Sequence, residues 1–142
     1  IIGSGEEEMN LRDLVRKYFL EDKVIFHGYK NRDEIVIFYK NADIFVFPSL
    51  NDAFGLVLVE ALASKLPLIA SKYAGGARDT VVENENGYII DPDDTVRFGE
   101  KIELLLKDKA LREKMGNKSF ELSKNFYLKN VIDGFFEAIN KC

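Results

Sequence analysis

"DIFVFPSLNDAFGLVLVEALASKLPLIAS", residues 43–71, predicts a strand, a helix and a second strand in succession. The run 43–49 is apolar until it ends in Pro-Ser, a pattern typical of a strand buried on both faces. A helix is expected from Phe54 to Ser64, and the apolar run 67–71 predicts the second strand. Since parallel strands are joined by a crossover that is usually a helix, this stretch predicts a parallel βαβ unit.

The same alternation continues on both sides of this unit. Upstream, the expected elements are a helix over 9–19, a strand over 24–27 and a helix over 33–39. Downstream we expect a glycine turn at Gly75 and Gly76, a short helix through Val82 and a strand over 86–91. Asp94 or Thr95 can cap a helix that runs through Leu106. Closing helices are expected over 110–125 and 127–140, with Gly116 and Gly134 as weak points. This order predicts an α/β fold, a Rossmann-like doubly wound parallel sheet with helices on both faces.

The length of the chain predicts one domain. Its 142 residues suffice for a single core, so we expect one domain over 1–142 whose closing helices occupy about 110–140. Ile1 and Ile2 run into a glycine turn without a start methionine. We therefore expect this domain to be truncated at its N-terminus, with the chain opening at the end of a strand.

The composition excludes several classes of protein. A net charge of −4 disfavours nucleic acid as a partner, because affinity for a phosphate backbone comes from clustered Lys and Arg. The only cysteine is Cys142, so no intrachain disulfide can form and a cytoplasmic protein is expected. No apolar run approaches the roughly 20 residues that cross a bilayer, so any membrane contact, at the cytoplasmic face, would be peripheral.

Ligands of doubly wound folds bind at the carboxyl ends of the strands. The candidate loops are 3–6, 28–31, 49–55 and 72–77. In the third of these loops, Gly55 lets a ligand approach the backbone, and the free amides of the following helix favour an anion such as a diphosphate. A ligand with a diphosphate group is therefore expected at this loop.

Two acids flank the helix that follows this loop. Asp52 is either a helix N-cap or a carboxylate that reaches a hydroxyl group beside the phosphate. Glu60 is either an exposed helix glutamate or a carboxylate about two turns down the helix, aimed at vicinal hydroxyls such as those of a ribose. The residues alone leave both pairs of alternatives open.

Several other features favour ordinary structural roles. His27 is expected to pack at a strand end, Asp93 and Asp94 to cap a helix, and Lys124 and Lys129 to lie on solvated faces. "GSGEEE", residues 3–8, lacks the third glycine of a dinucleotide-binding loop and places glutamates where phosphates would bind. An apolar stripe is available to pack against a partner domain and consists of Phe135, Phe136 and Ile139.

"PSLNDAFGLVLVEALASKLPLIAS" resembles the signature of the retaining nucleotide-sugar glycosyltransferases of family 4, which have the GT-B fold with two Rossmann-like domains. That family has two glutamates separated by seven residues, and here Asp52 and Glu60 occupy those places. "IIGSGEEE" is similar to the family's "VGxG", "VIFHG" to "VxFxG", "NADIFVFPS" to "ADxFVxPS", "AGGARDTV" to "xGGxxExV" and "ENGYIIDPDD" to "xNGxLVxPxD". The resemblance extends over about residues 1–106.

The resemblance implies a C-terminal, donor-binding domain and a role for each matching residue. Glu60 would bind the ribose hydroxyls, and Asp52 would hold hydroxyls of the donor sugar and act as the catalytic residue. The donor would be an NDP-sugar, UDP- or GDP-linked, with no metal ion or other cofactor. The remaining donor-binding residues would be the backbone of Phe54, Gly55 and Leu56, at the diphosphate or the sugar, and the loop against the base, formed by Gly28, Tyr29 and Lys30.

The sequence departs from the family pattern in two respects. Asp52 is one methylene shorter than the family's glutamate, and the preceding region, which carries an Arg and a Lys that clamp the diphosphate in the family, is absent together with the acceptor-binding N-terminal domain. The resemblance therefore implies a sugar transferase as the full-length protein and an inactive isolated chain. The alternatives are a noncatalytic nucleotide-sugar-binding or association module and, less favoured, an NAD-dependent dehydrogenase.

Overall fold

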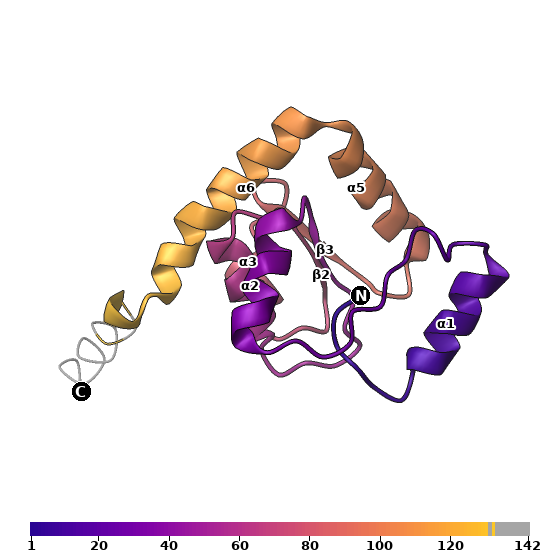
Figure 1. Cartoon of the computed structure of the whole chain (residues 1–142). Helices are drawn as coiled ribbons and strands as arrows, with labels where there is room; N and C mark the ends of the chain where they lie inside the picture. The colour runs from indigo at the N-terminus through magenta and orange to yellow at the C-terminus, as the bar shows by residue number, and fades with distance from the viewer. Residues whose placement is uncertain (131, 133–142) are drawn as a thin grey trace. The chain divides into compact units, whose positions relative to one another are not determined.

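The computed structural model describes residues 1–130 and 132, and its elements follow the chain in the order shown in Figure 1. The described chain divides into two compact units, Ile1–Phe38 and the residues from Tyr39 onward, and the single domain expected from the length of the chain stays a prediction. No helix within the described residues is both long enough and apolar enough to cross a membrane. The two units are described separately below.

The first unit contains the helix α1 (Glu8–Lys17) and two short extended segments. The Ile1 amino group donates to the Ile25 carbonyl at 2.6 Å, and the His27 amide donates to the Ile1 carbonyl at 2.9 Å, as in a parallel ladder. These bonds make residues 24–27 extended but do not make them a strand, so the predicted strand is reduced to this pairing.

Helix α2 (Arg32–Asn41) begins in the first unit and ends in the second. The side chain of Asn31 accepts from the Glu34 amide, and the Glu34 carboxylate accepts from the Asn31 amide, each at 3.0 Å. This reciprocal pair is a capping box, which fixes the start of α2 one residue before the predicted helix.

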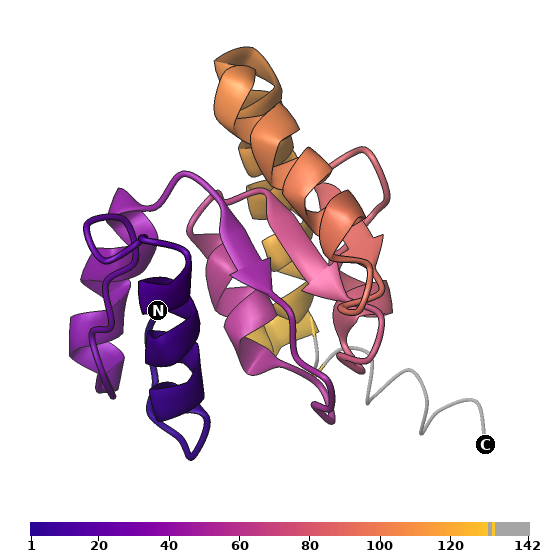
Figure 2. The ribbon, with the colours of Figure 1, turned by 90° about the vertical axis from the view of Figure 1, so that its right-hand side faces the viewer.

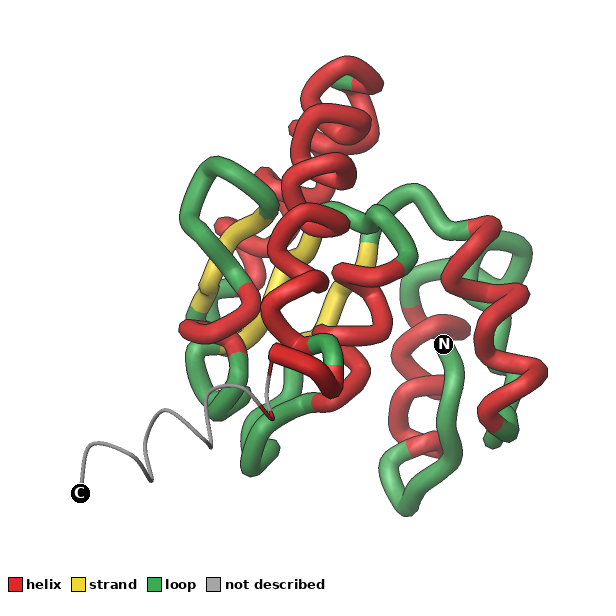
Figure 3. Tube along the Cα trace, turned by 90° about the vertical axis from the view of Figure 1, so that its left-hand side faces the viewer, coloured by secondary structure: helices red, strands yellow, loops and turns green. Residues whose placement is uncertain are grey.

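The second unit contains a three-stranded parallel sheet in the order β1-β2-β3, with strands β1 (Phe45–Phe47), β2 (Leu68–Ser71) and β3 (Gly87–Ile90). Figure 3 shows the strands side by side. Every residue of β2 is buried, but Val46 of β1 is 36% exposed. The expectation of a strand covered on both faces is therefore right for central β2 and wrong for β1, which lies at the edge of this sheet.

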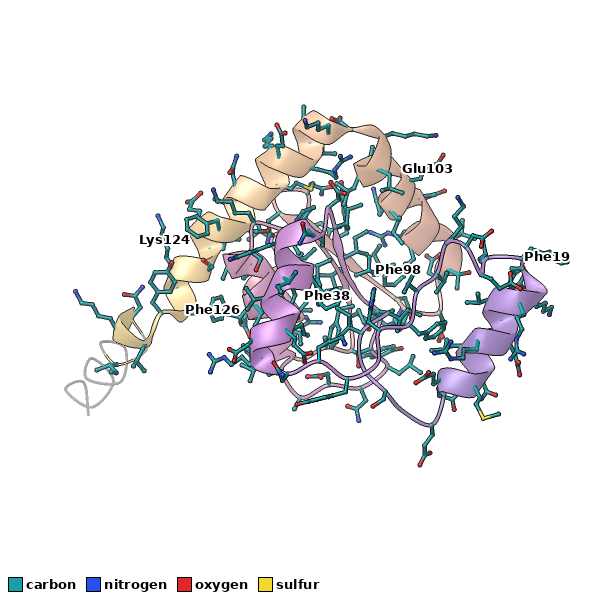
Figure 4. The ribbon with its side chains drawn as sticks, in the orientation of Figure 1. Phe19, Phe38, Phe98, Glu103, Lys124 and Phe126 are labelled. Carbon is teal, nitrogen blue, oxygen red and sulfur yellow. The ribbon has the colours of Figure 1, made fainter. Side chains whose placement is uncertain are left out.

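Helices cover both faces of this sheet, as Figures 1 and 2 show. Helix α3 (Leu56–Ala63) packs on β2 from one side, and helix α5 (Thr95–Lys107) packs on β2 and β3 from the other. On α5, Phe98 is buried toward the sheet whereas Glu103 points into solvent (Figure 4). The core on the α5 side consists of Ile69, Tyr88, Ile90, Phe98, Leu105 and Met115.

The predicted cap of α5 is confirmed at one of two residues. The Asp94 carboxylate accepts from the Arg97 amide at 3.0 Å and is the N-cap. Asp93 is not a cap, because its amide donates to the Asp91 carboxylate instead. Fixing the cap at Asp94 places the start of α5 directly after the loop that leaves β3.

Helix α6 (Lys109–Ser123) packs against α3 and is followed by a 3-10 turn, η1 (Lys124–Phe126). Helix α6 runs through Gly116, which was predicted to be a weak point of this helix. A Cβ at Gly116 would lie 2.2 Å from the Lys65 carbonyl oxygen, so glycine is what allows α6 to approach the end of α3. Outside the described residues lie Gly134, Phe135, Phe136, Ile139 and most of the predicted closing helix over 127–140.

Candidate functional site

The loops that follow β1 and β2 are joined through their backbones. Asp52 and Ala74 form a parallel bridge, and the Gly75 amide donates to the Asp52 carbonyl at 2.9 Å. The Gly76 amide donates to the Phe54 carbonyl at 2.8 Å. We call these joined loops, residues 49–55 and 72–76, the backbone frame. The frame lies at the carboxyl ends of two parallel strands, where the ligand loops were predicted.

Two glycines make the close approach within the backbone frame possible. A Cβ at Gly75 would lie 2.1 Å from the Ala53 carbonyl oxygen, and one at Gly76 would lie 2.4 Å from the Phe54 carbonyl oxygen. The Phe54 carbonyl oxygen also accepts from the Gly76 amide, so it cannot move away without breaking a backbone hydrogen bond of the frame. The short helix α4 (Ala77–Thr80) begins directly after these glycines.

The N-terminus of α3 opens from the backbone frame. Its N-cap is Gly55, in a left-handed conformation with φ +82°, and no side chain within the described residues caps the helix. The amides of the first turn of a helix have no acceptor inside the helix and carry the positive end of its dipole. This N-terminus therefore has the chemistry of an anion site.

Asp52 is not the N-cap of α3, because Gly55 occupies that position. Its Oδ1 accepts a hydrogen bond from the Phe54 amide at 3.0 Å, which closes a turn just before the helix. The side chain is half-buried. A carboxylate can accept several hydrogen bonds, so Asp52 retains acceptor capacity for a ligand hydroxyl while it holds this turn.

Glu60 lies on the exposed face of α3 and has a partner there. Its Oε2 accepts a hydrogen bond from the hydroxyl of Tyr39 at 2.9 Å. Leu56 is 70% exposed one turn earlier on the same face. Glu60 is therefore exposed, as the first of its two alternatives has it, and its side chain is held by a bond from another helix.

Tyr39 is a residue of this site that the sequence did not reveal. It is only 7% exposed, in the last turn of α2, and its ring lies 5.7 Å from that of Phe45. Burial, together with the hydrogen bond to Glu60 and the charge of Glu60, raises the pKa of the Tyr39 phenol well above its ordinary value. The hydroxyl is thus held in its protonated, donating form.

Phe54 connects the backbone frame to the end of the described chain. Its ring meets that of Phe126 edge-on, with centroids 6.5 Å apart, and Phe126 belongs to η1 (Figure 4). The same ring lies where a side chain at Gly76 would be. Phe54 therefore contributes packing as well as its backbone groups to the frame.

The loop expected to meet the base belongs to the first unit. Gly28 has φ +65°, Tyr29 is 77% exposed and Lys30 is half-buried. The neighbouring His27, expected to pack at a strand end, is exposed and follows no strand, and its ring lies 4.6 Å from that of Phe38. Within the described residues, no group of three His, Cys, Asp or Glu side chains could hold a metal ion.

The comparisons with known proteins bear on the chain as a whole. Residues 1–122 match the family described as "Glycosyl transferases group 1". The chain belongs to this family. One curated group 1 relative, the capsular polysaccharide biosynthesis glycosyltransferase CapM of Staphylococcus aureus, is 35% identical over 132 residues, which are 93% of this chain and 34% of that protein. The chain spans about a third of the length of the curated relatives it matches first.

Solved structures of glycosyltransferases share the fold. The C-terminal domain of LpcC, a glycosyl transferase group 1 protein of Francisella tularensis, gives a TM-score of 0.77 at 30% identity over 86% of this chain and 64% of that one. HepE of Anabaena, solved in complex with UDP-glucose, gives 0.84 at 23% identity over 99% and 40%. The predicted fold is confirmed as an α/β domain that matches the C-terminal half of a GT-B glycosyltransferase.

Proposed function

We propose that this chain is the donor-binding domain of a retaining glycosyltransferase, which moves a sugar from an NDP-sugar to an acceptor hydroxyl. The observation that carries the proposal is the uncapped N-terminus of α3, which opens from the backbone frame beside Asp52. An anion site next to a half-buried carboxylate suits a ligand that combines a diphosphate with hydroxyl groups. The UDP-glucose bound by HepE is a ligand of this kind.

Each part of the site has a role in this proposal. The backbone at Gly55 and Leu56 meets the diphosphate or the sugar, and Asp52 accepts from hydroxyls of the sugar. The role expected for the Phe54 backbone is dropped, because its amide donates to Asp52 and its carbonyl accepts from Gly76. Glu60 accepts from the ribose hydroxyls. The loop of Gly28, Tyr29 and Lys30 lies against the base, as the resemblance implies.

The proposed chemistry is positional and electrostatic. The bond between the anomeric carbon and the diphosphate breaks, and the amides of α3 stabilise the negative charge that develops on the leaving group. Asp52 orients the sugar so that the acceptor oxygen bonds to the anomeric carbon on the leaving-group face, and the proton of the acceptor hydroxyl passes to the departing diphosphate oxygen. Residues outside this chain supply the acceptor and complete the clamp on the diphosphate, so the isolated chain binds donor but transfers nothing.

Calorimetry tests the binding part of this proposal. The chain is titrated with UDP-, GDP- and ADP-glucose and with NADH, and we expect at least one nucleotide sugar to bind and NADH not to bind. Glu60→Ala should remove most of the affinity, whereas Glu103→Ala, an exposed glutamate of α5, should leave it unchanged. Unchanged affinity in Glu60→Ala, or preferential binding of NADH, contradicts the proposal.

A noncatalytic nucleotide-sugar-binding or association module is the second candidate, and one observation favours it. Asp52 is a short carboxylate already bonded to the Phe54 amide, which limits its reach to a sugar. In the full-length protein, Asp52→Asn should abolish transfer while leaving donor affinity within about threefold, because asparagine keeps an oxygen that accepts hydroxyls of the sugar. If sugar transfer survives Asp52→Asn, the Asp52 carboxylate stabilises the loop and has no catalytic role.

A further inference from the structure

We propose that Tyr39 is a positioning residue, which holds the Glu60 carboxylate in the orientation that accepts the hydroxyls of a nucleotide ribose. The inference rests on the proposed function of Glu60 and extends it to a residue on a different helix. It begins from the 2.9 Å hydrogen bond between the Tyr39 hydroxyl and Oε2 of Glu60.

Tyr39 is well fixed, and Glu60 by itself is not. The tyrosine is 7% exposed and packs against the ring of Phe45, which itself stacks on Phe47 at 6.2 Å. Glu60 is exposed on α3, where an unrestrained glutamate samples several rotamers at little cost. A bond from a fixed donor to a mobile acceptor selects the rotamers of the acceptor, so Tyr39 determines where the carboxylate points.

The hydrogen bond leaves the carboxylate able to bind a ligand. Tyr39 donates to Oε2, so Oε1 and the second lone pair of Oε2 remain as acceptors. A ribose presents two adjacent hydroxyl donors, which a single carboxylate can accept together. The phenol must stay protonated for this role, and a tyrosine hydroxyl is protonated at neutral pH.

Two ligands separate a positioning role from a structural one. Calorimetry of the chain with UDP and with 2′,3′-dideoxy-UDP measures how much affinity depends on the ribose hydroxyls. Tyr39→Phe keeps the aromatic packing and removes only the hydroxyl, and we expect affinity for UDP to fall about fivefold and affinity for dideoxy-UDP to stay the same. Glu60→Ala should lower affinity for UDP about thirtyfold, and adding Tyr39→Phe to it should have no further effect.

Tyr88→Phe is the matched control, because Tyr88 is also a buried tyrosine, 3% exposed, but belongs to the core on the α5 side. This variant should bind both ligands as the unsubstituted chain does. If Tyr39→Phe lowers the affinity for both ligands equally, Tyr39 has a structural role and the inference is wrong. If Tyr39→Phe keeps the preference for UDP over dideoxy-UDP while Glu60→Ala abolishes it, Tyr39 does not position Glu60. The inference is then wrong, and the proposed function still stands.

Two further outcomes test the proposed function of Glu60, and one measurement on the unsubstituted chain tests the positioning role of Tyr39. Unchanged affinity for UDP in Glu60→Ala, or no binding of UDP, GDP or ADP to the unsubstituted chain, overturns both proposals. In the unsubstituted chain, NMR should find the Tyr39 hydroxyl proton protected from exchange both without and with UDP. Loss of this protection on binding means that UDP and Tyr39 compete for the carboxylate, which contradicts positioning.

Discussion

The backbone frame leads into α3 at Gly55, and the pair of Tyr39 and Glu60 lies more than one turn further along this helix, but the two are built differently. In the frame, amides and carbonyls of Asp52, Phe54 and the two glycines bond to one another. The pair depends on two side chains that meet through one hydrogen bond. Substituting most side chains therefore leaves the frame intact, whereas removing one oxygen atom breaks the pair.

The difference predicts opposite sensitivities. The frame tolerates loss of side-chain atoms but not their addition, because its carbonyls stand where a Cβ would be. The pair tolerates neither loss nor shortening of its side chains, although either residue can be replaced without disturbing the backbone. The following four substitutions test this contrast, from the largest expected effect to the smallest.

Gly75→Ala should have the largest effect. Its Cβ would lie 2.1 Å from the Ala53 carbonyl oxygen, so the frame must open, and we expect a loss of about 3 kcal/mol in the free energy of unfolding. Urea denaturation measures the loss. Gly99→Ala is the control, since nothing lies within 4 Å of its Cβ, and alanine in α5 should stabilise by about 0.5–1 kcal/mol. If Gly75→Ala and Gly99→Ala are equally stable, the frame does tolerate added side-chain atoms and this prediction is wrong.

Gly55→Ala should cost less, because backbone strain replaces a backbone collision. At φ +82° an alanine costs about 1–2 kcal/mol, and its Cβ meets only side-chain atoms, of Leu58 and Phe47, at 3.2 Å. Gly55→Asn should cost less than Gly55→Ala, since asparagine tolerates the left-handed region. Thermal and urea unfolding measure the stability of both variants. If Gly55→Asn is less stable than Gly55→Ala, crowding by the larger side chain outweighs the backbone strain.

Asp52 supports the frame through a hydrogen bond of its side chain, so its roles in stability and in ligand binding can be separated. Asp52→Ala removes the acceptor of the Phe54 amide and should cost about 1 kcal/mol of stability. Asp52→Asn keeps an oxygen at this position and should change stability by less than about 0.5 kcal/mol. If urea denaturation gives both variants the same loss, the charge and not the hydrogen bond stabilises the turn.

Tyr39→Phe tests the pair through its pH dependence, which is the smallest effect near neutrality. The folded-state pKa of Tyr39 is raised above the ordinary value of 10.0, so the unfolded chain releases this proton first as the pH rises. The stability it contributes is complete below pH 10 and is lost as the pH rises toward the folded-state pKa. Between about pH 7 and about pH 10.5, unfolding curves of Tyr39→Phe should therefore lose less stability than those of the unsubstituted chain. Parallel declines would contradict this.

Local patterns predicted most of the fold. The apolar runs gave β2 and β3, and the Asp94 cap gave the start of α5, because each depends on a few neighbouring residues. The capping box of Asn31 and Glu34 has the same local character and could have been found in the sequence. The close approach at Gly116 could not, since a glycine within a helix looks the same whether it weakens the helix or lets another element approach.

The candidate site was predictable to a lesser degree. The loop and its glycines follow from strand order, but the role of Asp52 in the loop depends on where α3 begins, and Gly55 rather than Asp52 holds that position. The pairing of Tyr39 with Glu60 joins residues 21 positions apart on separate helices. No periodicity in a single sequence encodes such a contact.

The construction of the backbone frame has a consequence for how substrate preference can diverge. The side chains of Leu50, Asn51 and Tyr73 project from the frame, with Leu50 69% and Tyr73 45% exposed, and its backbone hydrogen bonds do not depend on them. Selection can therefore exchange these side chains one at a time without unfolding the loops. New recognition chemistry could arise on an old scaffold in this way, and deep mutational scanning would show broad tolerance at these three positions beside intolerance at the glycines.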